Sequence, residues 1–230
     1  MPRKPLVVKI GGHLLFRKEE LDANYIKELV SVLRENKGIL IPLIIVVGGG
    51  AFARKYIGAL RCIGIQNESA CDYIGIEVSR VNAALLAAAY YGIPHEIPRN
   101  FADALQSAQS SKITFIGGLQ PGQSTTTVAA LIAEALGARA LIIATDVDGV
   151  YTADPKKDPK AKLLRTVTTT ELRAMFRRIT KAGGYALLDP YTLDIIERGK
   201  LTTKIINGKP ATNIVKAAEG ESIGTTIKPI

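Results

Sequence analysis

The chain has 230 residues, of which 47% are hydrophobic and 22% are charged. This composition is typical of a globular protein with a substantial core and excludes a disordered chain. Lysine and arginine total 30 against 21 aspartates and glutamates, and the resulting net charge of +9 suits anionic ligands such as phosphates. Only two cysteines occur, so we expect no disulfide framework and a reducing compartment.

No segment is typical of a membrane span or a secretory signal. The longest apolar run, residues 39–47, is interrupted by Pro42 and has about half the length that a spanning helix needs. The first twelve residues contain too short an apolar run for a signal peptide. We therefore expect a cytoplasmic protein that makes no membrane contact.

Short β-rich runs alternate with longer helical patterns along the chain. The spacing predicts strands over residues 6–10, 43–47, 113–116, 141–144, 202–206 and 225–227. It predicts helices over residues 24–35, 51–60, 74–90, 125–136, 170–181 and 189–197. Ser124 or Thr125 is suited to cap the helix that begins there. The alternation predicts an α/β fold, a three-layer αβα sandwich with a mostly parallel central sheet.

Four glycine-rich or polar turns follow four of the predicted strands. They lie at residues 9–13, 48–50, 117–125 and 145–151. In a parallel sheet these turns gather at the carboxyl edge, where open α/β sheets bind ligands. Glycine lets the backbone N–H groups approach a phosphate closely, and each turn opens a helix whose N-terminus favours anions. One such turn can be simple chain reversal, but the four together predict a site for several phosphates.

The fingerprints of several common nucleotide and hydrolase classes are absent from the sequence. It contains neither G-x-x-x-x-G-K-[ST] nor G-x-G-x-x-G after a strand, which disfavours a P-loop ATPase and a Rossmann dehydrogenase. It contains no H-E-x-x-H and no paired C-x-x-C, which disfavours a zinc site. The nucleophile elbow G-x-S-x-G is absent as well.

Three charged residues near these turns are candidates for contacts with a nucleotide. Lys9 interrupts an apolar run, so it either binds an anion or lies on an edge strand in water. Arg54 follows the triple glycine by one helical turn and either reaches a phosphate or is an exposed helix residue. Asp72 either caps a helix or accepts from a ribose hydroxyl. His13 and His95 have no visible partner, and we assign neither as a metal ligand or base.

The motifs extend over almost the whole chain. They are K-I-G-G at 9–12, V-V-G-G-G-x-x-A-R-K-Y-I at 46–57, D-x-I-G-I at 72–76, G-G-x-x-P-G-Q-S-T at 117–125, A-T-D-V-D-G-V-Y-T-A-D-P-K-K-D-P at 144–159, L-L-D-P at 187–190 and G-T-T-I-K-P at 224–229. With these motifs the chain resembles the amino-acid kinase superfamily and, within it, the archaeal-type uridylate kinases.

The resemblance implies transfer of the γ-phosphoryl group of MgATP to UMP, giving UDP and ADP. It implies catalytic roles for Lys9 and Asp146. It implies ATP-binding roles for Lys9, Ile10, Gly11, Gly12, His13, Gly50, Arg54, Thr145, Tyr151 and Asp154. It implies UMP-binding roles for Gly49, Asp72, Leu119, Gln120, Pro121, Gly122, Gln123, Ser124 and Thr125. One domain would span residues 1–230, with a UMP-binding half near 1–140 and an ATP-binding half near 141–230, in a homohexamer built from dimers.

Phosphoryl transfer requires positioning and charge neutralisation more than covalent chemistry. A UMP phosphate is already an anionic nucleophile, so no dedicated base is demanded. Magnesium would be held largely by the nucleotide phosphates and by water, which accords with a sequence that shows no carboxylate cage and no protein metal site.

The sequence departs from the resemblance at a few positions. Asp146 stands where archaeal uridylate kinases often have Asn, and an acid there resembles acetylglutamate kinases, in which it organises the catalytic lysines. Lys9 is not universal in the archaeal group, and His13 lies where relatives commonly have a small or basic residue. For a second catalytic lysine, Lys181 is the best candidate and Lys204 a weaker one.

Three alternatives remain open at this stage. An acetylglutamate kinase is disfavoured because Val47 stands where those enzymes generally have His. A nucleotide sensor without turnover is disfavoured by the presence of Lys9, Arg54 and the acidic turn. Nucleic-acid binding is disfavoured because the basic residues are scattered and no recognised reader motif occurs.

Overall fold

One seven-stranded sheet runs through the computed structural model, which describes residues 3–153, 155, 158–180 and 188–230. In spatial order its strands are β5 (Ile113–Ile116), β4 (Leu43–Val47), β1 (Leu6–Ile10), β6 (Ala140–Thr145), β8 (Thr203–Asn207), β9 (Thr225–Lys228) and β7 (Thr166–Thr168). Neighbouring strands pair in parallel except β8 with β9. The mostly parallel α/β sheet is therefore confirmed.

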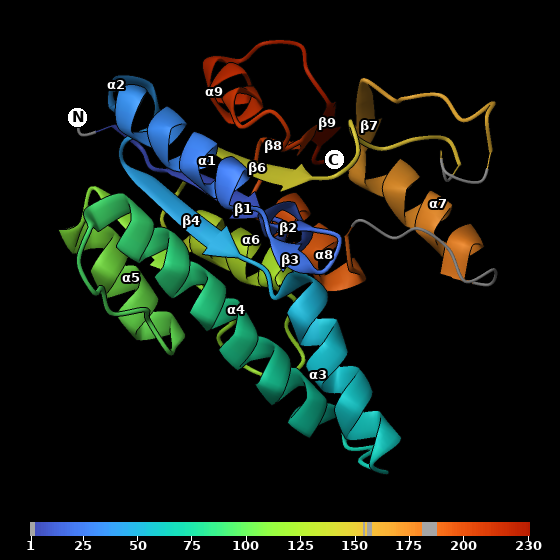
Figure 1. Cartoon of the computed structure of the whole chain (residues 1–230). Coiled ribbons are helices and arrows are strands. Elements are labelled where there is room, and N and C mark those ends of the chain that lie inside the picture. The colour runs from blue at the N-terminus through green and yellow to red at the C-terminus, as the bar shows by residue number, and fades with distance from the viewer. Residues whose placement is uncertain (1–2, 154, 156–157, 181–187) are drawn as a thin grey trace.

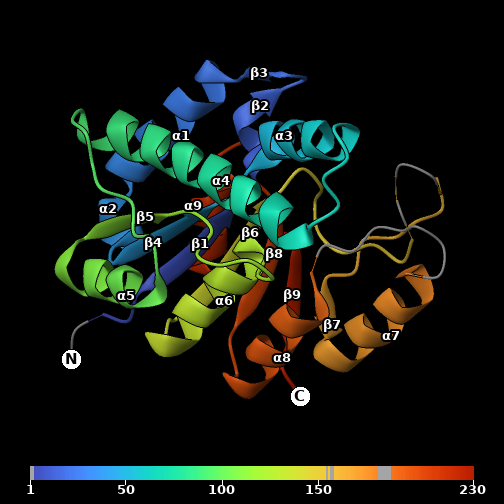
Figure 2. The same cartoon turned by 90° about the horizontal axis from the view of Figure 1, so that it is seen from below.

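Helices cover both faces of this sheet, as Figure 2 shows most clearly. One face carries α1 (Ala23–Glu35), α2 (Lys37–Leu40), α4 (Glu68–Tyr91) and α9 (Thr212–Glu219). The other face carries α5 (Phe101–Ser110), α6 (Thr125–Ala135), α7 (Thr169–Thr180) and α8 (Pro190–Arg198). This arrangement is the three-layer sandwich that the alternation of strands and helices predicts.

Strand β1 shows how the sequence divides between the two layers. Side chains alternate across a strand, so Leu6, Val8 and Ile10 join the core under α1 and α4. Val7 joins the opposite core under α6 and α8. Lys9 follows Val7 on that second face and is the next-to-last residue of the strand, close to the carboxyl edge of the sheet. Because both faces are covered, the strand is apolar almost throughout.

Two helices extend past the sheet. Helix α3 (Gly50–Cys62) and the long α4 pack along each other and project away from the strands in Figure 1. A short 3-10 helix (Gly12–Leu15) and a hairpin of β2 (Phe16–Arg17) and β3 (Glu20–Leu21) lie between β1 and α1. None of the helices in the described ranges is long and apolar enough to cross a membrane.

Several elements differ from the sequence prediction. Helices α2, α5 and α9, strand β7 and the β2–β3 hairpin are absent from that prediction. Helix α5 has only ten residues and buries only the small side chain of Ala104. Helix α4 begins at Glu68, six residues earlier than expected, because Asn67 caps it through the backbone N–H of Ala70. The predicted helix over 170–181 corresponds to α7, and Lys181 lies outside the described residues.

Candidate nucleotide-binding site

The loops that follow the central strands meet at the carboxyl edge of the sheet. Backbone hydrogen bonds join them in sequence across the strands: Gly48 N–H donates to Ile10 at 3.0 Å and Gly11 N–H to Ala144 at 2.9 Å. Gly208 N–H, after β8, donates to Thr145 at 2.8 Å. The predicted convergence of separate turns is therefore confirmed at the level of the backbone.

The first and second glycine turns are in direct backbone contact. A Cβ atom added to Gly12 would lie 2.3 Å from the carbonyl oxygen of Gly48 and 2.3 Å from the amide nitrogen of Gly50. Gly50 also has a φ of +66°, a backbone conformation that residues other than glycine rarely adopt. The three glycines are thus required for the two turns to touch. The contact brings the N-terminus of α3, with its partial positive charge, to the first turn.

Lys9 lies at the centre of this edge rather than on an edge strand. Strand β1 has neighbours on both sides, with Lys9 opposite Val46 in β4 and Ile143 in β6. Burial lowers the pKa of Lys9 to about 8, and the nearby Asp146 carboxylate opposes this shift. The alternative of a water-exposed edge lysine is therefore wrong. A lysine that is only partly exposed, beside several glycine turns, is suited to bind anionic oxygen.

The turn after β6 brings a polar cluster to the same edge. Asp146 Oδ1 lies 3.4 Å from His13 Nε2 of the first turn. Thr145 Oγ1 lies 3.5 Å from the same ring nitrogen. Asp148 accepts from Tyr151 at 3.2 Å and from Asn207 at 3.0 Å, which fixes the side chains at the ends of β6 and β8. Asp154 lies outside the described residues.

A cavity of about 150 Å³ lies where the third turn meets helix α4. Asp72, Gln123 and Thr125 line it together with Ile57, Gly75, Ile76, Ser79 and Gly118. Asp72 Oδ2 accepts from Gly122 N–H at 2.8 Å, so this carboxylate supports the third turn. The alternative that Asp72 caps its helix is wrong, because Asn67 provides that cap.

The other predicted residues of the third turn are unequally placed. Ser124 is the residue that caps α6, through the N–H of Thr127 at 3.0 Å. Gln120, Pro121 and Gly122 are exposed, whereas Leu119 is partly buried. Arg54 is exposed on the first turn of α3, at the same edge of the sheet.

Three residues of α4 support these turns, and the sequence analysis missed them. Asn82 Nδ2 donates to the carbonyl oxygens of Gly48 and Gly49 at 2.8 and 3.2 Å. Ser79 Oγ accepts from Gly118 N–H at 2.6 Å.

The third of these residues is Arg80, whose side chain is only 11% exposed. It donates to the carbonyl oxygens of Gly118 at 3.1 Å, Leu119 at 3.3 Å and Arg99 at 2.7 Å. Polar side chains at this spacing in an otherwise apolar helix are the signal that could have revealed all three, since buried polar groups need partners.

Lys204, the weaker candidate for a second catalytic lysine, does not lie among the glycine turns. It lies near the amino end of β8, and its ammonium group donates to the carbonyl oxygens of Glu221 at 2.8 Å and Ala217 at 3.4 Å. Burial lowers its pKa. Lys204 therefore stabilises the chain around the end of α9. Its position at the amino end of β8 places it far from the carboxyl edge.

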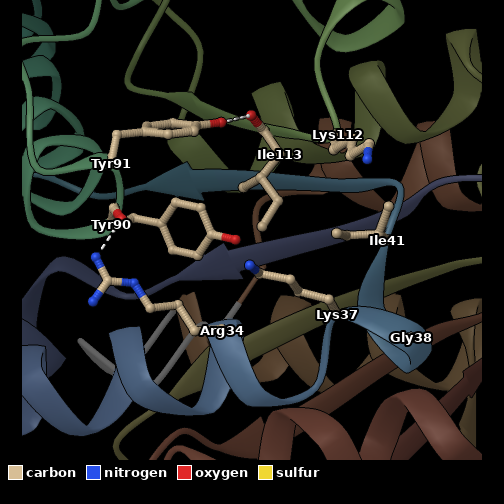
Figure 3. Close-up of a pocket in the computed structure, with 8 residues that line it drawn as sticks. All are labelled: Arg34, Lys37, Gly38, Ile41, Tyr90, Tyr91, Lys112 and Ile113. Carbon is tan, nitrogen blue, oxygen red and sulfur yellow. Dashed lines mark hydrogen bonds between the residues drawn. The ribbon is translucent and has the colours of Figure 1, made fainter.

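A larger cavity, of about 720 Å³, lies at the opposite edge of the sheet, before strands β4 and β5 (Figure 3). Arg34 there donates to the carbonyl oxygens of Ala89 and Tyr90 at the end of α4. Tyr91 donates to Ile113 at 2.6 Å. These side chains stabilise the helix end and the strand start, and no glycine turn reaches this cavity. This cavity therefore lies apart from the turns that the sequence analysis singled out.

Glycine turns at the strand ends around a partly buried lysine are typical of α/β proteins that bind phosphates. Comparison with known proteins agrees with this class. The model of the amino acid kinase family matches residues 4–207. The uridylate kinase of Thermofilum pendens is 46% identical over 226 residues, covering 96% of this chain and 95% of that protein. The uridylate kinase of Hyperthermus butylicus is 40% identical over 228 residues, covering 99% of each. The crystal structure of uridylate kinase from Archaeoglobus fulgidus superposes with a TM-score of 0.83 at 36% identity, covering 97% of this chain and 99% of that one. The chain belongs to the amino acid kinase family.

Proposed function

We propose that this protein is an ATP-dependent uridylate kinase that transfers the γ-phosphoryl group of ATP to UMP, giving UDP and ADP. The observation that carries the proposal is the backbone contact between Gly12 and the turn of Gly48 and Gly50. It joins the turn beside Lys9 to the second turn, which itself lies against Thr125 at the small cavity, so two phosphate chains can meet there end to end. The full-length similarity to uridylate kinases supports UMP as the acceptor.

We assign the two nucleotides to the two sides of this contact. ATP would lie on the side of the turns after β1 and β6, which carry Lys9, His13, Thr145 and Tyr151, with Gly50, Arg54 and Asp154 completing its contacts. UMP would lie at the cavity of the third turn, with its ribose near Asp72 and Gly49. The proposed halves, near 1–140 and 141–230, both contribute strands to the one seven-stranded sheet.

In this arrangement Lys9 would stabilise the transferred phosphoryl group as charge moves from the leaving oxygen to the attacking one. The N-termini of α3 and α6 would add partial positive charge at the same place. Asp146 would keep Lys9 protonated and oriented, because its charge opposes the effect of burial on the Lys9 pKa. The nucleophile is a UMP phosphate oxygen, which needs no general base.

We propose that a magnesium ion arrives with ATP, held mainly by the phosphates and water. The described residues contain no group of three or more His, Cys, Asp or Glu side chains that could hold a metal. Asp146 and Asp148 are the carboxylates of the turn after β6, and Asp148 is already engaged by Tyr151 and Asn207. Magnesium bound to the phosphates would neutralise their charge.

A phosphotransfer assay with UMP, CMP and N-acetylglutamate as acceptors tests the proposed function. We expect phosphorylation of UMP with release of ADP. Phosphorylation of N-acetylglutamate alone would identify an acetylglutamate kinase instead. ATP binding without turnover on any acceptor would identify a nucleotide sensor.

We also propose that the protein is cytoplasmic and assembles as a homohexamer built from dimers. An apolar groove of about 410 Å³ lies along α3 and α4 and supports a dimer surface there. Tyr56 in α3 and Val81 in α4 border it and are 58% and 67% exposed. Contiguous exposed apolar surface of this kind marks interaction sites. Multi-angle light scattering of the wild type and of Val81→Asp would test it, with smaller particles expected for the variant.

A further inference from the structure

The carboxylate of Asp189 accepts more hydrogen bonds than a helix cap requires. Asp189 precedes α8, and its Oδ1 accepts from Thr192 N–H at 2.8 Å, which satisfies the cap. Its Oδ2 accepts from three hydroxyl groups: Ser124 at 2.7 Å, Thr192 at 2.8 Å and Thr127 at 2.9 Å. Two of these donors belong to α6 and its preceding turn, more than sixty residues earlier in the chain.

The hydrogen bond to Ser124 fixes both functions of that hydroxyl group. The Ser124 oxygen accepts from Thr127 N–H at 3.0 Å and so caps α6. Its hydrogen is directed to Asp189 at 2.7 Å, a short bond to a charged acceptor. A serine with both roles occupied has one favoured rotamer, and the position of its backbone is fixed accordingly.

Asp189 is ionised at neutral pH and therefore only accepts. Its partial burial by itself would raise the pKa, but the hydrogen bonds from Ser124, Thr192 and Thr127 outweigh this effect and lower it. An ionised carboxylate has no proton to donate. In the hydrogen bonds to Asp189 the hydroxyl groups are therefore the donors, and these bonds tie the start of α6 to the start of α8.

The neighbours of Ser124 line the small cavity at the third turn. Gln123 and Thr125 are both lining residues. Thr125 Oγ1 also lies against the second turn, since a Cβ added to Gly48 would be 3.4 Å from it. The other end of the turn is held by Asp72 through Gly122 N–H. Displacement of Ser124 would therefore move both cavity residues while the rest of the turn stays in place.

We propose that Asp189 is a positioning residue for UMP, which acts through Ser124 to hold the turn of residues 119–125 and the start of α6 in the conformation that binds the nucleotide. The inference rests on the proposed function, which places UMP at this cavity. It links the C-terminal part of the chain, which carries α8, to the acceptor site on the other side of β1. In the sequence, Asp189 and Pro190 mark only the start of a predicted helix.

The variant Asp189→Asn tests the proposal. Its side-chain oxygen can still cap α8, but the NH2 group cannot accept from Ser124. Loss of a hydrogen bond to a charged group corresponds to about a tenfold change in an equilibrium constant. We expect the Kd of UMP, measured by calorimetry without ATP, and the KM of UMP to rise about tenfold. The KM of ATP should change less than about twofold.

Further variants separate positioning from stability. Thr192→Val removes one hydroxyl donor of the same carboxylate but leaves the bond to Ser124, so we expect a lower Tm with unchanged UMP affinity. Adding Ser124→Ala to Asp189→Asn should weaken UMP binding little further, because both changes remove the same bond. If Asp189→Asn does not fold, Ser124→Ala alone should show the selective UMP defect. Asn100→Ala, which removes the cap of α5, is its matched control and should leave UMP affinity unchanged.

Unchanged UMP affinity in folded Asp189→Asn would overturn the inference, as would equal losses for UMP and ATP or multiplicative effects in the double variant. A selective loss for UMP in Thr192→Val equal to that of Asp189→Asn would also overturn it, because the bond to Ser124 would then be irrelevant. A wild type that neither binds nor phosphorylates UMP would instead contradict the proposed function.

Discussion

Replacing Lys9 by methionine should make the protein more stable and nearly inactive. Methionine has a similar length and lacks the charge, so the variant Lys9→Met removes an ammonium group that the fold must enclose. The pKa of Lys9 is lowered from 10.5 to about 8 because burial disfavours the charged form. At pH 7 the folded protein still carries that charge, which is less favourable there than in the unfolded chain.

The magnitude follows from the two pKa values. The difference between 10.5 and about 8 corresponds to about 3 kcal/mol of free energy of unfolding. Below pH 8 both states are protonated and the penalty is fully present. Between pH 8 and 10.5 the unfolded chain binds more protons, so the stability of the wild type should rise with pH. Lys9→Met should lack this rise and exceed the wild type by up to about 3 kcal/mol at pH 7.

The same substitution should lower kcat for UMP phosphorylation by about 100-fold or more, since a preorganised cation beside the transferred group is lost. Affinity for ATP should fall much less. In the free wild-type enzyme kcat/KM for ATP should decline above pH 8, because by pH 9 only about a tenth of Lys9 is protonated.

Urea denaturation at pH 7, 8, 9 and 10, with kinetics on the same preparations, measures both effects. Lys4→Met is the matched control: Lys4 is exposed just before the same strand, and its loss should change stability by less than about 0.5 kcal/mol. A Lys9→Met variant that is clearly less stable than the wild type at pH 7 would refute the argument from burial. Unchanged kcat would remove Lys9 from the mechanism.

Three further predictions concern other parts of the site. Gly12→Ala should separate the first two turns and abolish UMP phosphorylation, whereas Gly38→Ala, with no atom within 4 Å of the added Cβ, should leave activity unchanged; steady-state kinetics of both variants decides. Lys204→Met should change Tm without lowering kcat, and a large fall in kcat would place Lys204 in the mechanism after all. Tyr151→Phe should lose the hydrogen bond to Asp148 and raise the KM of ATP by a few-fold, with the KM of UMP as internal control; a larger change for UMP would contradict our placement of ATP.

The backbone framework follows from local patterns in the sequence. The apolar runs at β1, β4 and β5 have the same limits in the sequence prediction and in the structure. Buried parallel strands and glycine turns are local signals, so one sequence suffices to find them. Helices α5 and α9 were not predicted; they are short, with ten and eight residues, so each offers few turns over which an apolar repeat can be recognised.

The side chains that support the candidate site do so through contacts between segments that are distant in the chain. Asp72 lay near a predicted helix start and Asp189 began a predicted helix, yet Asp72 supports Gly122 fifty residues away and Asp189 binds Ser124 sixty-five residues away. The sequence leaves open whether Lys9 lies on an edge strand. The pairing of β1 with β4 on one side and β6 on the other places Lys9 inside the sheet.

The sequence by itself determined that glycine-rich and polar turns follow parallel strands and that an amino acid kinase family fold carries them. Tertiary structure alone decided which side chain supports which turn and how deeply Lys9 is enclosed. The physical reason is that strand and turn propensities depend on neighbours along the chain, whereas hydrogen-bond partners and burial depend on neighbours in space.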